Sequence, residues 1–218
     1  MLETILPAYV ASEEHFGESV TADLFPEEQA IVAHAVESRR REYATVRGCA
    51  RACLERLGYA PVPILPGIGG APMWPAGVVG SMTHCAGYAA AAVGRLARVS
   101  AIGIDAEPDA PLPDGVLDLV ATAAERDRLA ATQPESDGPN WDRLLFSAKE
   151  ALYKAWFPLV GEWLDHQEAE ILFEPQDRTF TALLFRDGLI VNGREIHRLN
   201  GGWIAERGIL LTAIVLAS

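Results

Sequence analysis

The chain has 218 residues, with 30 acidic against 18 basic side chains, which gives a formal net charge of −12 at pH 7. This excess of negative charge argues against a protein that coats nucleic acid or an anionic membrane, because such binding pairs phosphates with Lys and Arg. Hydrophobic residues make up 50% of the chain, enough for the core of one domain or of two small lobes.

The first residues, MLETILPAYVASEEHFGE, contain no basic segment followed by a long apolar one. The apolar run at 209–217 is shorter than the ~20 residues of a membrane helix. We therefore expect a cytoplasmic protein.

Residues 26–57 predict one or two helices, with Pro26 in a first turn and Gly58 as the stop. Cys49 and Cys53 fall at i, i+4 in this region, which favours buried thiols over a disulfide or a metal site. The apolar stripe at helical spacing consists of Tyr43, Val46, Ala50, Cys53, Leu54 and Leu57.

The same helical region carries one third of the basic residues of the chain. Two interpretations stay open: a solvated basic helix face, and a site for a bound anion. These residues are Arg39, Arg40, Arg41, Arg47, Arg51 and Arg56.

The elements that follow predict an α+β chain of two lobes, with a boundary near 105–113. A Pro- and Gly-rich loop at 60–77 is either a plain connector or a functional loop. Strands are predicted at 78–84, 87–95 and 97–105, helices at 114–131 and 140–157, an exposed loop at 133–140, and strand-like segments at 169–173, 178–185, 188–193 and 208–216.

The third strand ends in GIDAE, where Asp105 and Glu107 lie at i, i+2 and so face the same side of an extended chain. Paired carboxylates of this kind suit Mg²⁺, which keeps its other positions for water and substrate phosphates. Acidic residues at strand ends are also common without a metal, and this alternative stays open.

The helix WDRLLFSAKEALYKAWF places Glu150 and Lys154 at i, i+4, on a face different from its apolar stripe. An ordinary surface ion pair explains this spacing equally well. However, Lys149 and Lys154 are the two lysines of the entire chain. A third polar segment, GSMTHCAGY at 80–88, contains His84, which is either a structural histidine, a phosphate donor or a proton carrier.

Taken together, these segments closely resemble the 4′-phosphopantetheinyl transferases, in particular the actinobacterial members of the two-lobed surfactin-synthetase/enterobactin type. The resemblance extends from about residue 36 to the C-terminal strand. Its motifs are RRREYATVRGCAR, PILPGIGGAPMWPAGVVGSMTHCAGYAAAAV, GIDAE and FSAKEALYKAWFP.

The resemblance implies two similar lobes, 1–105 and 106–218, each a small, mainly antiparallel sheet packed with helices, with the active site in the cleft between them. It implies transfer of phosphopantetheine from coenzyme A to a serine of apo acyl or peptidyl carrier proteins, with release of adenosine 3′,5′-bisphosphate. The carriers would belong to fatty-acid, polyketide or nonribosomal peptide synthases, and the enzyme would act as a monomer.

The residue roles follow from the same resemblance. Asp105, Glu107 and Glu150 match ligands of Mg²⁺, with Mn²⁺ as an alternative, and Glu150 is also a candidate base for the serine hydroxyl. Lys154 matches the lysine that contacts the transferred phosphate. Asp105 lies beside the bound pyrophosphate. The remaining coenzyme A contacts implied by the resemblance are Thr83 and His84 at the nucleotide phosphates, with a catalytic role for His84, and Arg39 and Arg47 at the adenosine 3′-phosphate.

One segment departs from the family. Related enzymes have a lysine in the loop that corresponds to ILPGIGGAP, whereas this chain has no basic residue there. We expect the loop to contact coenzyme A through backbone NH groups, with Arg40 or Arg51 as the compensating cation.

Two other functions remain as alternatives: a catalytically inactive regulator that binds coenzyme A, and a metal-dependent phosphohydrolase. The carrier surface would be locally apolar or basic, because the enzyme and typical carrier domains are both acidic.

Overall fold

The computed structural model describes residues 1–20, 23–131, 138–187, 189–191 and 193–218. Its main helices are α1 (Pro26–Ile31), α2 (Glu37–Arg56), α3 (Val116–Val120), α4 (Ala123–Ala131) and α5 (Trp141–Val160), with short 3₁₀ turns η1 (Leu2–Ile5), η2 (Ile68–Gly70) and η3 (His166–Glu168). Its strands are β1 (Ala11–Phe16), β2 (Val78–Cys85), β3 (Tyr88–Arg95), β4 (Val99–Pro108), β5 (Ala169–Glu174), β6 (Thr179–Leu184), β7 (Ile190–Val191), β8 (Arg194–Glu195), β9 (Arg198–Glu206) and β10 (Ile209–Ala217).

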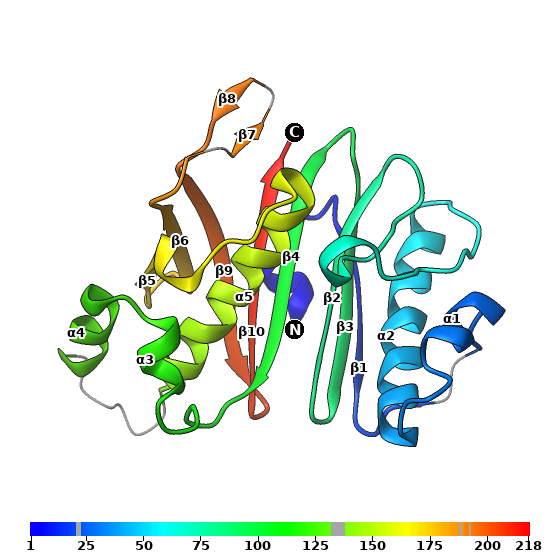
Figure 1. Ribbon diagram of the computed structural model, residues 1–218, viewed down its shortest axis with the longest axis horizontal. Helices are drawn as coiled ribbons and strands as arrows, with labels where there is room; N and C mark the ends of the chain where they lie inside the picture. Colours follow the sequence, from blue (N-terminus) through cyan, green and yellow to red (C-terminus); the bar gives the residue numbers. More distant parts are fainter. Residues whose placement is uncertain (21–22, 132–137, 188, 192) are drawn as a thin grey trace.

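The strands form two antiparallel sheets, each covered by one long helix (Figure 1). The first has the order β1-β3-β2 and packs against α2; the second has the order β4-β10-β9-β6-β5 and packs against α5. Strands β7 and β8 form a separate hairpin. This arrangement confirms the predicted α+β class.

Strand β3 is buried along almost its whole length because it has cover on both faces. Ala91 and Val93 pack with the apolar side of α2, whereas Ala90 and Ala92 pack toward the second sheet. Small side chains on this strand allow helix and sheet to approach from opposite sides.

The two sheets meet where β2 lies beside β4 (Figure 1). Side-chain hydroxyls join these strands: the backbone NH of Ile104 donates to Ser81 Oγ at 3.1 Å, and that of Ala106 donates to Thr83 Oγ1 at 3.0 Å. Strand β4 pairs along its other edge with β10 and runs through position 105. The division at 105/106 stays a prediction.

The single helix predicted at 114–131 is wrong in detail, because the chain becomes extended at Ala121 between α3 and α4. Thr122 and Glu125 then begin α4 with reciprocal bonds: Glu125 NH donates to Thr122 Oγ1, and Thr122 NH donates to Glu125 Oε2. The predicted loop at 133–140 lies largely outside the described residues.

Strands β1, β8 and β9 were not predicted. β9 contains Gly201 and Gly202, which lower strand propensity. The structure requires a small residue at 201, since a Cβ there would lie 2.2 Å from the ring of Phe180.

Among the described residues, no helix is long and apolar enough to cross a membrane.

Candidate active site

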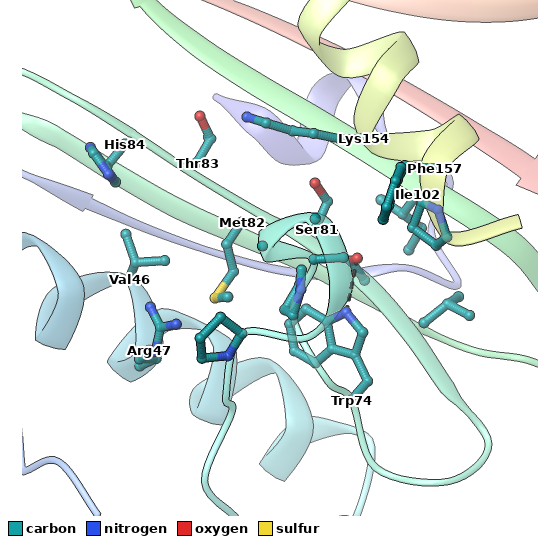
Figure 2. A pocket seen from close by; sticks show the side chains of 18 of the residues that line it. Val46, Arg47, Trp74, Ser81, Met82, Thr83, His84, Ile102, Lys154 and Phe157 are labelled. Carbon is teal, nitrogen blue, oxygen red and sulfur yellow. Dashed lines mark hydrogen bonds between the residues drawn. The ribbon is translucent and has the colours of Figure 1, made fainter. Parts of the chain in front are cut away.

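A cavity of about 720 Å³ lies between α2 and β2 on one side and β4 and α5 on the other, with the loop at 60–77 along its border. This volume is within the usual range for small-molecule sites. Figure 2 shows several of the side chains that line it. The polar and aromatic lining residues used below are Arg39, Tyr43, Arg47, Trp74, Thr83, His84, Glu150, Tyr153, Lys154 and Phe157.

The loop at 60–77 reaches across the cavity to α5. Its residue Gly69 has φ +63°, and a Cβ there would lie 2.4 Å from the ring of Phe157. The base of the loop is fixed by Trp74, whose indole NH donates to the carbonyl of Gly80 at 3.0 Å (Figure 2). The sequence therefore places glycine where the loop must contact a helix of the other sheet.

Arg39 and His84 form a contact at one end of the cavity, with Arg39 Nη1 2.6 Å from His84 Nε2. Because arginine only donates, His84 Nε2 accepts and the imidazole is neutral. Burial, followed by the charge of Arg39, lowers the pKa of His84 below its usual value. This histidine therefore presents a neutral ring beside a cation.

Arg47 is largely buried and is held from two sides. Its Nε donates to the carbonyl of Ile64 at 3.1 Å, and its guanidinium lies 3.1 Å from the centre of the Tyr43 ring. The hydroxyl of Tyr43 is buried without a hydrogen-bond partner among the described residues. Arg47 and Tyr43 thus both line the cavity from α2.

Lys154 reaches the cavity from α5 (Figure 2). Its Nζ donates to Asp105 Oδ1 at 2.7 Å and to the carbonyl of Ile104 at 3.1 Å. The helix can approach β4 this closely because residue 103 is glycine: a Cβ there would lie 1.9 Å from the carbonyl oxygen of Ala151. The glycine of GIDAE therefore determines where Lys154 lies.

Asp105 is 5% exposed and shares its Oδ1 between Lys154 and the Thr83 hydroxyl, which donates at 3.3 Å. Burial raises the pKa of Asp105 despite the neighbouring lysine. Its Oδ2 has no hydrogen-bond partner among the described residues. A buried carboxylate oxygen left unpaired is costly unless a cation completes its environment.

The other two carboxylates each have a cationic or potentially cationic partner. Arg143 Nη1 donates to Glu107 Oε2 at 2.9 Å, and burial, followed by the charge of Asp105, raises the pKa of Glu107. Glu150 Oε1 lies 3.3 Å from His166 Nε2, and this hydrogen bond lowers the pKa of Glu150.

The donor set fits a hard divalent cation in its chemistry, with three carboxylates and the unpaired Asp105 Oδ2. These three side chains do not bring one oxygen each to within 4.8 Å of one another. In the described part of the chain, that condition is met by the exposed group Asp187, Glu195 and His197.

The structure brings most of the predicted residues to one cavity. The predicted residues that line it are Arg39, Arg47, Thr83, His84, Glu150 and Lys154. Asp105 does not line the cavity itself but contacts two lining residues, Lys154 and Thr83. Glu107 does not line it.

Sequence reasoning missed several contributors to the site. Tyr43, Tyr153 and Phe157 could have been identified from the spacing of aromatic residues in the two helices that carry the motifs. No sequence pattern indicated His166, which lies in the turn after α5. The missed residues are Tyr43, Trp74, Tyr153, Phe157 and His166.

The arginines expected to replace the missing loop lysine are engaged elsewhere. Arg40 donates to the backbone carbonyls of Ala33 and Ala35, and Arg51 donates to both carboxylate oxygens of Glu28. Neither belongs to the lining of the cavity. The i, i+4 ion pair with Lys154, which was the alternative for Glu150, does not form either, because Glu150 contacts His166 instead.

Comparison with known proteins places these motifs in one family. The model of the 4′-phosphopantetheinyl transferase N-terminal domain matches residues 27–94, and the model of the 4′-phosphopantetheinyl transferase superfamily matches residues 101–198. The chain belongs to the 4′-phosphopantetheinyl transferase superfamily. It is an enzyme, since its full-length relatives are transferases.

Three curated actinobacterial relatives match essentially the whole length of this chain. The transferase Svp of Streptomyces mobaraensis is 50% identical over 100% of this chain and 90% of its own. The transferase PptT of Mycobacterium tuberculosis is 46% identical over 99% and 98%, and the transferase Npt of Nocardia iowensis is 46% identical over 100% of both chains. These matches confirm the resemblance seen in the motifs.

Proposed function

We propose that this transferase moves phosphopantetheine from coenzyme A to the serine of an apo acyl or peptidyl carrier protein, with release of adenosine 3′,5′-bisphosphate. The observation that carries the proposal is that Arg47 on α2 and Lys154 on α5 line one cavity beside the buried carboxylate of Asp105. Two separated cations suit a ligand with phosphates at two places, as coenzyme A has.

In the proposed complex, the adenosine 3′-phosphate is bound by Arg47 and Arg39, and the pyrophosphate lies near Thr83, His84 and Lys154. Because His84 Nε2 accepts from Arg39, the neutral ring carries its proton on Nδ1, which is the nitrogen that can donate to a ligand.

The serine oxygen of the carrier attacks the β-phosphorus, and the bond from that phosphorus to the oxygen of the adenosine bisphosphate breaks. Negative charge grows on the phosphoryl and leaving oxygens, so a fixed cation such as Lys154 lowers the barrier. Glu150 is a carboxylate at neutral pH and is the proposed acceptor of the serine proton. The hydrogen bond from His166 lowers its pKa, so that bond makes it a weaker base.

Asp105, Glu107 and Glu150 are the proposed ligands of Mg²⁺, with Mn²⁺ as an alternative. The bound ion would supply charge neutralisation for the pyrophosphate. Arg143 contacts Oε2 of Glu107 and His166 contacts Oε1 of Glu150, so the second oxygen of each carboxylate would be the one offered to the ion. We propose that the enzyme acts as a cytoplasmic monomer, since both long helices of the cavity come from one chain.

Intact mass spectrometry of an apo carrier protein tests this function. After incubation with the enzyme, coenzyme A and Mg²⁺, the carrier is expected to gain the mass of one phosphopantetheine group, and EDTA or Glu150→Gln is expected to prevent the gain. Glu13→Gln, outside the cavity, is the matched control and should leave transfer intact. Coenzyme A binding without transfer to fatty-acid, polyketide or peptide carriers would favour the inactive regulator instead.

A further inference from the structure

Glu28 on α1 is a fully buried carboxylate, 0% exposed, that joins three segments of the first lobe. Both of its oxygens accept from Arg51 Nη1 on α2 at 3.0 Å. Its Oε1 also accepts from the backbone NH of Ile64 at 2.9 Å, and its Oε2 from the NH of Phe25 at 3.0 Å. A buried carboxylate with this many donors is firmly oriented.

The peptide of Ile64 connects Glu28 to the cavity. Its NH donates to Glu28, and its carbonyl accepts from Arg47 Nε at 3.1 Å. The same carbonyl contact, together with the ring of Tyr43, fixes the plane of the Arg47 guanidinium. Arg47 also lines the cavity, so a ligand bound there can reach its guanidinium group.

The two arginines beside Glu28 lie at unequal distances from its carboxylate. Glu28 lies 3.0 Å from Arg51 and 4.0 Å from Arg47, so its charge is largely engaged by Arg51. Arg51 also donates to the carbonyl of Asp23 and does not line the cavity. Two guanidinium groups against one carboxylate leave an excess positive charge, and Arg47 presents it to the cavity.

We propose that Glu28 is a positioning residue that aims Arg47 at the 3′-phosphate of coenzyme A. It acts through the Ile64 peptide, which it holds by hydrogen bond, and through Arg51, which keeps the carboxylate from capturing Arg47. The inference rests on the proposed function, because the ligand of Arg47 is taken from it. It explains why a glutamate is fully buried beside two arginines, one of them at the border of an anion site.

The test compares the affinities of the full chain for coenzyme A and for 3′-dephospho-coenzyme A by isothermal titration calorimetry. The wild type is expected to prefer coenzyme A. Glu28→Gln is expected to reduce this preference about tenfold, equivalent to about 1.4 kcal/mol, with dephospho-coenzyme A binding nearly unchanged. Glu13→Gln is the matched control, because Glu13 on β1 pairs with Arg56, the last residue of α2, away from the cavity. This variant should keep the preference for coenzyme A.

Opposite predictions separate this role from simpler ones. If Glu28 only neutralised positive charge, Glu28→Gln would tighten coenzyme A binding; if it only stabilised the fold, the thermal midpoint would fall with the preference unchanged. Either result overturns the inference, as does a wild type without preference for the 3′-phosphate.

A second variant covers the case in which Glu28→Gln does not fold. Arg51→Met frees the carboxylate to pair with Arg47, now 4.0 Å away, and is expected to reduce the preference to a similar extent. An unchanged preference in Arg51→Met contradicts the inference. Because binding is measured without a carrier, absence of phosphopantetheine transfer by the wild type would refute the proposed function and leave this test intact.

Discussion

Replacing Gly103 by alanine tests how closely α5 must approach β4. The added Cβ would lie 1.9 Å from the carbonyl oxygen of Ala151 and 2.7 Å from the backbone nitrogen of Ala155. Relative to an ordinary contact of about 3.5 Å, the helix has to withdraw by roughly 1.6 Å. Both obstructing atoms belong to the backbone, so no side-chain rotation relieves the overlap.

Overpacking of this kind costs about 1–3 kcal/mol of unfolding free energy, and we expect the upper end. The same movement displaces Lys154 from Asp105 and Ile104, which it contacts at 2.7 and 3.1 Å. Misplacement of a reactive group by about 1 Å lowers rates about 100-fold. Gly103→Ala is therefore expected to lower both the stability and the transfer rate.

Urea unfolding and single-turnover transfer measure the two effects. Gly94→Ala is the matched control, because a Cβ at Gly94 on β3 meets only side-chain atoms, the nearest 3.1 Å away on Val99. Flexible neighbours should limit its cost to roughly 1 kcal/mol. A Gly103→Ala variant as stable and as active as Gly94→Ala would refute the reasoning about the close approach of helix and strand.

Three further predictions concern the cavity. Gly69→Ala forces a side chain into a positive-φ position against the ring of Phe157 on α5. The KM for coenzyme A should rise roughly tenfold, and the free energy of unfolding should fall by about 1–3 kcal/mol. An unchanged KM would exclude the loop from the site. Lys154→Met should lower single-turnover transfer at least ~100-fold by removing the cation beside Asp105, and a near-normal rate would remove Lys154 from the chemistry. Burial, then a neighbouring arginine, lowers the pKa of His84, so the unfolded chain binds more protons just below the ordinary value of 6.5, and stability should rise with pH through that window. Denaturation at several pH values should give a smaller rise for His84→Gln; equal rises would contradict the burial argument.

The sequence predicted most elements whose pattern is local. Helical spacing identified the region of α2 and α5, and alternation with turn residues identified β2 and β3. The break between α3 and α4 was missed although Thr122 and Glu125 have the spacing of a capping box. Strand β9 was missed because Gly201 and Gly202 have low strand propensity, and only the packing of Phe180 and Ile5 accounts for them.

The site was predicted as a set of residues but not as a set of contacts. Glu150 and Lys154 have the spacing of a helical ion pair, yet Lys154 pairs with Asp105, about fifty residues earlier in the chain. Such a partner depends on the close contact of α5 with β4, which no local pattern encodes. In the same way, Glu28 follows Pro26 in a polar helix start typical of solvent exposure, whereas the fold buries it completely.

The central claim is that coenzyme A lies between α2 and α5 with its phosphates at Arg47 and Lys154. A crystal structure with coenzyme A and Mn²⁺, located by its anomalous scattering, tests this most directly. We predict the 3′-phosphate within hydrogen-bond distance of Arg47, the pyrophosphate beside Lys154, and the metal on Asp105 with Glu107 or Glu150. Coenzyme A bound outside this cavity, or a metal that contacts none of the three carboxylates, would contradict the account.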